Sequence, residues 1–274
     1  MDLDIRIINA ATRGTEDKLV QIGIRDGSYV RIADSVPGDP KVEIDAEGNL
    51  VTESFVNGHL HLDKVYTLEK VGQDALGSYH GVGMGGAMTA IEQASRIKES
   101  YDESWIIENV RRAADWVRQA MDLGADVVGG IPWIEFTEAD MRSHVDQMFE
   151  LARIYDKDVS MLVDDAGDST LRTLEYLAVQ SIKYGWQGRV TAQHARAMAL
   201  YEEPVFRRLT ALMKKGGVSL VSDPQTGPLH ARVEDLVKEG LPVALGQDDI
   251  ADAYYPFGRN NMLEVGFLAC HLLW

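Results

Sequence analysis

Val159-Ser160-Met161-Leu162-Val163-Asp164-Asp165 is a short apolar run that ends in two carboxylates. Similar apolar runs recur along the chain, at 54–58, 125–131, 189–192, 217–221 and 242–246. Amphipathic stretches that suit helices separate them, at 141–154, 170–184, 204–215 and 233–239. Near-continuous apolar strands that alternate with helices are typical of parallel βαβ units.

Ionisable side chains follow five of the six apolar runs. They are His59 and His61, Asp164 and Asp165, His194, Asp223, and Asp248 and Asp249. In a (β/α)8 barrel the carboxyl ends of the strands form the active-site face. We therefore predict an α/β fold, a (β/α)8 barrel, over residues 53–274. Residues 1–52 show short alternating strands with a hairpin turn at Asp26-Gly27, and they predict a small β-rich domain.

The predicted barrel is incomplete. It needs eight strands, but no strand pattern lies between His61 and Ala125. About 220 residues remain for a fold that typically takes about 250. The chain ends in an apolar, helix-like run at 262–274 with no capping residue after it. We expect that an internal piece and a C-terminal piece are missing, and that this last run can bury itself in a second copy, as in a homo-oligomer.

Composition and charge exclude several classes of function. The chain has 43 acidic and 27 basic side chains, a formal net charge of −16, which disfavours nucleic acid and anionic membranes as partners. Its single cysteine, Cys270, permits neither an intrachain disulfide nor a Cys-rich zinc module. No membrane span and no signal peptide are visible in the sequence. We expect a cytoplasmic protein whose partner is a small molecule.

Four of the strand-end side chains predict a metal site. His59 and His61 are two residues apart and project to the same side of an extended segment. Barrel geometry aims His194 and Asp248 at the same mouth. Each has a plain structural alternative, because isolated H-x-H pairs are often surface loops, lone histidines are often structural, and Asp suits a helix N-cap. Taken together, these N and O donors suit one Zn²⁺ or Fe²⁺ with an open position for water.

Such an ion lowers the pKa of its water from about 16 toward about 7, which favours hydrolysis at an electron-poor carbon. An amide, an amidine or a ring C–NH2 fits that chemistry. Asp248 is also a candidate proton acceptor from that water. Of Asp164 and Asp165 only one can face the mouth, as a general acid/base or a ligand, unless both merely solvate the loop. We expect substrate contacts from Asp249, His230, Trp133 and Tyr254.

Three segments carry a family resemblance: residues 57–64, 189–194 and 246–258. On these the sequence resembles the amidohydrolase superfamily, and within it the cytosine-deaminase-like branch. The resemblance implies that His59, His61 and Asp248 bind one divalent metal and that His194 lies on or beside it. It also implies hydrolysis of a C–N bond in a nitrogen heterocycle, such as cytosine or a related ring, through a metal-activated water.

The chain departs from that family pattern in three ways. Leu162 stands where the family has a metal-binding histidine, and Asp165 where it has a proton-shuttling glutamate. Two strands that relatives possess are missing. An alternative therefore stays open: the chain is a non-catalytic or truncated amidohydrolase-like protein that binds a small molecule without turnover.

Overall fold

The computed structural model describes residues 2–14, 18–61, 118–119, 121–250 and 257–273. The chain divides into two compact units, Met1–Val56 and Asn57–Trp274. None of the helices described is both long and apolar enough to cross a membrane.

The N-terminal unit is a four-stranded sheet in the order β3-β2-β1-β4. Its strands are β1 (Asp2–Ala10), β2 (Val20–Arg25), β3 (Ser28–Ala33) and β4 (Asp39–Asp45). The predicted turn is confirmed, because Arg25 pairs with Ser28 across Asp26-Gly27 and both turn residues have positive φ. Ala10, Val20 and Ile22 form a small buried cluster.

The second unit contains five parallel strands that lie side by side in chain order. They are β5 (Val127–Gly130), β6 (Asp158–Val163), β7 (Val190–His194), β8 (Val218–Ser222) and β9 (Val243–Leu245). This order is that of consecutive strands in the wall of a (β/α) barrel, and it confirms the predicted βαβ organisation. The stretch in which we predicted no strand, from His61 to Ala125, lies almost entirely outside the described residues.

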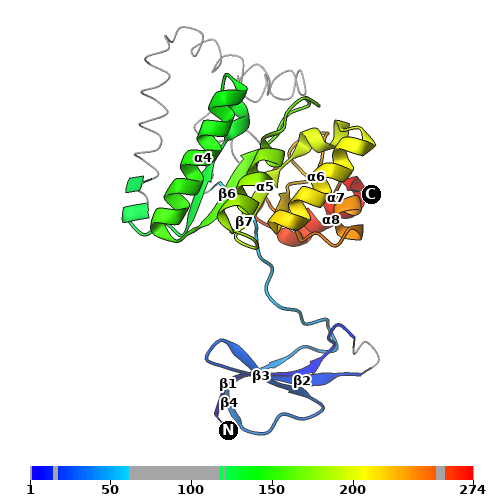
Figure 1. The fold of residues 1–274 in the computed structure, drawn as a ribbon. Coiled ribbons are helices and arrows are strands. Elements are labelled where there is room, and N and C mark those ends of the chain that lie inside the picture. The colour runs from blue at the N-terminus through cyan, green and yellow to red at the C-terminus, as the bar shows by residue number, and fades with distance from the viewer. Residues whose placement is uncertain (1, 15–17, 62–117, 120, 251–256, 274) are drawn as a thin grey trace, which may run out of the picture. The chain divides into compact units, whose positions relative to one another are not determined.

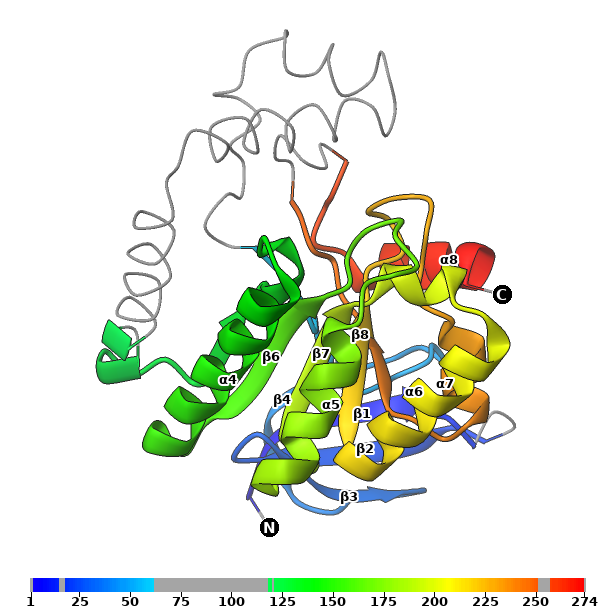
Figure 2. The same cartoon turned by 45° about the horizontal axis from the view of Figure 1, so that its top comes forward.

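Helices cover one face of this sheet (Figures 1 and 2). They are α4 (Glu138–Tyr155), α5 (Thr173–Tyr184), α6 (Glu203–Gly216) and α7 (Val233–Lys238). The unit also contains the 3-10 turns η2 (Pro132–Ile134) and η3 (Arg196–Leu200) and the last helix, α8 (Met262–Leu272). Helices α4, α6 and α7 contact the strands directly, and α5 packs between α4 and α6. The buried face between helices and sheet holds the main hydrophobic core, whose largest members are Phe149 and Phe206.

Local sequence explains where these helices begin and end. Thr137 caps α4 by accepting a hydrogen bond from the backbone N–H of Asp140 at 3.2 Å. The C-cap residues of α5 and α6 are Gly185 and Gly217, both in the left-handed region that glycine adopts without strain. Each helix ends just before its glycine, and the chain reverses direction there and enters the next strand.

One predicted strand is wrong. Residues 54–58 do not form a strand, and the nearest sheet pairing is a single bridge between Leu60 and Asp248. The reason is a contact with a segment that is distant in the sequence. Asn57 bonds that segment through its side chain rather than its backbone, since its Oδ1 accepts from the backbone N–H of Gln247 at 2.9 Å. The chain there is extended but only partly paired.

The inner face of the five-stranded sheet carries polar side chains. Gln193 Nε2 donates to Ser160 Oγ at 2.7 Å, and the hydroxyls of Thr191 and Ser219 lie 2.9 Å apart. Leu162 projects to the same side as Ser160, because side chains alternate along a strand. The side chain at position 162 therefore faces inward, on the side where a ligand would be needed.

Candidate metal centre

Backbone hydrogen bonds join the His59–His61 segment to the segment that follows β9. The N–H of His61 donates to the carbonyl of Asp248 at 2.8 Å, and the N–H of Asp248 donates to the carbonyl of His59 at 2.9 Å. Gly58 donates in the same way to Leu245 at 3.2 Å. These bonds fix the register between two segments from nearly opposite ends of the barrel unit, so their side chains meet.

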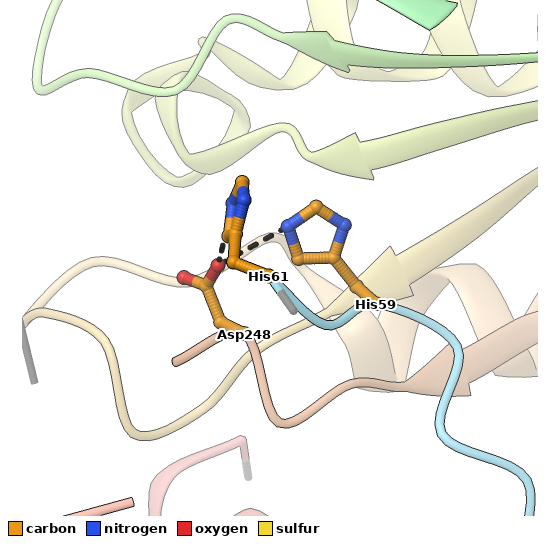
Figure 3. A group of neighbouring side chains, drawn as sticks. All are labelled: His59, His61 and Asp248. Atoms are coloured by element: carbon orange, nitrogen blue, oxygen red, sulfur yellow. Dashed lines mark ion pairs between the residues drawn. The ribbon is translucent and has the colours of Figure 1, made fainter. Parts of the chain in front are cut away.

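His59, His61 and Asp248 converge at this point (Figure 3). Asp248 Oδ1 lies 3.1 Å from Nε2 of His59 and 3.4 Å from Nε2 of His61. One ligand atom from each residue lies within 4.8 Å of the others. Asp248 holds a left-handed backbone, with φ of 64°, which turns its carboxylate toward the two imidazoles.

The chemistry of this group fits a divalent metal ion. It offers two imidazole nitrogens and one carboxylate oxygen, the donors that zinc and ferrous iron accept. His59 Nε2 is buried, and among the described residues it has no hydrogen-bond partner of good geometry. Burial alone would raise the pKa of Asp248, but the close contact with His59 and the charges of the nearby histidines outweigh it and hold that pKa well below its usual range. Asp248 is thus kept as a carboxylate, the form that binds a cation.

His194 lies beside this group at the end of β7. Its ring stands edge-on to that of His59, with the ring centroids 4.9 Å apart. Its Nδ1 lies 3.1 Å from Asp223 Oδ2. Burial opposes protonation of His194, but the carboxylates of Asp223, Asp165 and Asp248 dominate and raise its pKa. The structure therefore places His194 next to the three converging residues rather than within their group.

Asp164 and Asp165 point in different directions. Asp164 is buried and accepts from Thr173 and Leu174 at the start of α5, so it serves as that helix's cap. Asp165 lies 3.1 Å from Nε of Arg196, with both side chains mostly buried. Burial is the largest influence on the pKa of Asp165 and raises it, although His194 and Arg196 pull it down. Of the pair, Asp165 is the one that lies among the site's charges.

The four predicted substrate contacts fall in different places. Asp249 is buried directly after Asp248. The indole Nε1 of Trp133 is buried and has no hydrogen-bond partner within the part of the chain that the structure describes. His230 is half-buried in a surface hollow with Arg232 and Leu272, where burial and the charge of Arg196 lower its pKa. Tyr254 lies outside the described residues.

Two residues of this region were not among the predicted site residues, although Asp223 was one of the strand-end residues from which the barrel was predicted. Arg196 contacts Asp165, and its Nη2 donates to Thr226 Oγ1 at 2.5 Å. Asp223 contacts His194 and is fully buried. The available signal for Asp223 was its position directly after an apolar strand, the same signal that identified Asp248. For Arg196 we find no comparable signal, because surface arginines are common after strands.

Comparison with known proteins places this site in a family context. A family model described as the amidohydrolase family matches residues 108–274. N-isopropylammelide isopropyl amidohydrolase of Pseudomonas sp. strain ADP is 26% identical over 318 residues, which cover 96% of this chain and 78% of that protein. Pterin deaminase of Rhizobium rhizogenes is 26% identical over 140 residues, 46% of this chain and 32% of that protein.

Solved structures show the same likeness. The crystal structure of 5-methylcytosine deaminase from Klebsiella pneumoniae liganded with 5-fluorocytosine superposes with a TM-score of 0.75 at 25% identity, over 98% of this chain and 80% of that one. N-isopropylammelide isopropylaminohydrolase from Burkholderia multivorans gives a TM-score of 0.75 at 19% identity, over 98% of this chain and 80% of that one, a likeness of fold.

The alignment with N-isopropylammelide isopropyl amidohydrolase of Pseudomonas sp. strain ADP bears on the predicted gap in the barrel. It runs over 318 positions, whereas the chain has 274 residues, so at least 44 positions within it have no residue in this chain. That one internal piece is missing stays a prediction.

Proposed function

Because the chain belongs to the amidohydrolase family, we propose that it is a metal-dependent hydrolase that cleaves a non-peptide C–N bond of a nitrogen heterocycle, by deamination or by amide or amidine hydrolysis. The observation that carries this proposal is the convergence of His59, His61 and Asp248 at the carboxyl edge of a parallel sheet. Active sites of barrel enzymes lie at that edge.

In this proposal His59, His61 and Asp248 hold one divalent ion, Zn²⁺ or Fe²⁺, and His194 lies on or beside it. When bound, the ion supplies the Lewis acidity that makes water nucleophilic near neutral pH. The low pKa of Asp248 keeps its carboxylate charged, so it can also accept a hydrogen bond from water at the site. The two histidines on one extended segment keep the donor nitrogens on one side.

Asp165 is proposed as the residue that carries protons at Oδ1 or Oδ2. Burial raises its pKa, and a carboxyl group titrating nearer to neutrality exchanges protons more readily under working conditions. Arg196, 3.1 Å away, fixes the orientation of this carboxylate. Asp249, His230, Trp133 and Tyr254 are proposed to contact the ring, which the named relatives suggest is a heterocycle with an exocyclic amino or alkylamino group.

Metal content and product analysis test this function together. The purified chain is stripped with a chelator, reloaded with Zn²⁺ or Fe²⁺, and incubated with cytosine, 5-methylcytosine, N-isopropylammelide and a pterin. We expect about one equivalent of metal and release of ammonia or an amine from at least one ring. His61→Gln should abolish both, whereas His271→Gln, an exposed histidine on α8, should change neither. If less than about a tenth of an equivalent of metal binds at micromolar Zn²⁺, the proposal fails.

Leu162 supports a second candidate function, small-molecule binding without turnover. Its inward-facing position holds no nitrogen or oxygen donor, so the set of possible ligands is smaller than the family pattern implies. Calorimetric titration of the same rings into zinc-loaded protein separates the candidates. Binding without product over many hours favours this second function, and product release favours the first.

A further inference from the structure

Asp223 is a fully buried carboxylate behind the candidate site. It directly follows β8, and its side chain is 0% exposed. Its Oδ2 lies 3.1 Å from Nδ1 of His194, whose side chain is 3% exposed at the end of the neighbouring strand β7. The pair is therefore shielded from water, where electrostatic contacts are strongest.

The packing around Asp223 leaves it little freedom to turn. A Cβ added at Gly246 would collide with Asp223 Oδ1 and would come within 2.7 Å of Cβ of His59. The backbone N–H of Gly246 also donates to the carbonyl of Ser222 at 3.0 Å, which ties the end of β9 to the residue before Asp223. The carboxylate is thus enclosed between the ends of β7 and β9.

Neither oxygen of Asp223 has a hydrogen bond of good geometry in the described part of the chain. A buried charge without a donor is unfavourable, so a nearby N–H is strongly favoured to turn toward it. Among the contacts recorded for Asp223, that N–H is Nδ1 of His194.

A competing partner for Nδ1 is Arg196. Its Nη2 lies 3.5 Å from Nδ1, and if it donated there, Nδ1 would be unprotonated and Nε2 would carry the hydrogen. However, the same Nη2 already donates to Thr226 Oγ1 at 2.5 Å. The shorter distance and full charge of Asp223 favour a proton on Nδ1.

We propose that Asp223 is a positioning residue: it accepts Nδ1–H of His194 and so presents an unprotonated Nε2 toward His59, His61 and Asp248. A histidine that binds a metal or a water through one nitrogen is commonly fixed by such an acceptor on the other. The consequence of this positioning for catalysis rests on the proposed function, whereas the fixed tautomer of His194 does not.

Nitrogen-15 NMR of the histidine rings tests the tautomer directly, in alkaline buffer where imidazoles are neutral. His194→Gln assigns the resonance. In the unaltered protein, with and without zinc, we expect the proton of His194 on Nδ1. In Asp223→Ala we expect a mixture of tautomers, and in Asp223→Asn, whose amide oxygen still accepts, the Nδ1–H form should largely persist. Asp164→Asn is the matched control, a buried acid whose donors come from α5 and Tyr201; it should lower the melting temperature without altering the His194 tautomer.

Zinc affinity and kinetics complete the test. We expect Asp223→Ala to weaken zinc binding or lower kcat about 10- to 100-fold, with KM little changed and partial recovery in Asp223→Asn. A proton on Nε2 in the unaltered protein, or an Asp223→Ala variant with unchanged tautomer and zinc affinity, overturns the proposal. If no ring is hydrolysed but the tautomer depends on Asp223 as described, the positioning role stands and the proposed function fails. If Asp223→Ala does not fold, the unaltered protein and Asp223→Asn still decide.

Discussion

Asp164 accepts both the backbone N–H and the hydroxyl of Thr173, at 2.7 and 2.6 Å. The last residue of the β6 region thereby caps the helix that begins nine residues later. Asp164 has a left-handed backbone, with φ of 47°, that turns its side chain toward α5 while Asp165 remains near Arg196. One tight turn thus gives two adjacent carboxylates different roles: Asp164 has a structural role and Asp165 a candidate functional one.

Removing the Asp164 carboxylate should destabilise the fold. Asp164→Ala leaves the N–H groups of Thr173 and Leu174 buried without their acceptor, and we expect a loss of about 2–3 kcal/mol in the free energy of unfolding. Asp164→Asn should lose less, because one amide oxygen still accepts. Urea denaturation measures both, and equal stability of Asp164→Ala and the unaltered protein would contradict the capping role.

Adding a methyl group at Gly246 should damage the candidate metal centre. The new Cβ would collide with Asp223 and press on His59, so we expect Gly246→Ala to weaken zinc binding by at least about tenfold. Gly266→Ala is the matched control. Nothing lies within 4 Å of the Cβ that it adds on α8, and it should stabilise the helix by about 0.5–1 kcal/mol. Zinc titration and thermal melting of both variants separate a local collision from a general effect of alanine.

A histidine at position 162 should strengthen metal binding. Leu162 faces inward one residue before the end of β6, where Val163 pairs with His194. Leu162→His adds an imidazole on the side of the sheet that leads to the site, and we expect zinc affinity to rise about tenfold or more. Leu162→Phe, which adds a ring without a donor, should not have this effect. Equal zinc affinity in the two variants would show that position 162 does not reach the ion.

The ion pairs between α6 and α7 should make stability depend on pH. Glu239 pairs with Lys214 and Arg207, and the hydrogen bond from Lys214 is the main reason that the pKa of Glu239 is lowered. A carboxyl group with a lowered pKa stabilises the fold above its unfolded pKa of about 4.5, and loses that effect as the pH falls through its folded pKa. The melting-temperature gap between the unaltered protein and Glu239→Gln should therefore be largest near neutrality, shrink below about pH 4.5, and shrink in high salt because the pair is exposed. A gap that grows on acidification would contradict this.

The sequence predicted the repeating part of the barrel well. The apolar run at 159–163 corresponds to β6 within one residue, and the run at 217–221 to β8, because the side chains on the core-facing side of these strands are apolar and buried. The start of α5 was placed three residues too early, at 170 instead of Thr173. Its true start depends on the carboxylate of Asp164, a contact across nine residues that no local pattern encodes.

Contacts between distant segments account for the rest. The sequence shows that polar residues follow the strands, but it does not show which of these residues contact one another. The contact of His194 with Asp223 joins two strands and depends on the missing side chain at Gly246. Likewise, the pairing of Asn57 with Gln247 replaced the strand that hydrophobicity alone predicted at 54–58.

The two halves of the candidate ligand set lie far apart in the chain, since Asn57 and Gln247 are 190 positions from each other. Joining them closes a very long loop. The entropy cost of that step is offset only by the contacts that form once the intervening strands have packed. We therefore expect any capture of an ion by His59, His61 and Asp248 to be a late event in folding. A refolding experiment with a zinc indicator should show metal uptake lagging behind the recovery of helical circular dichroism.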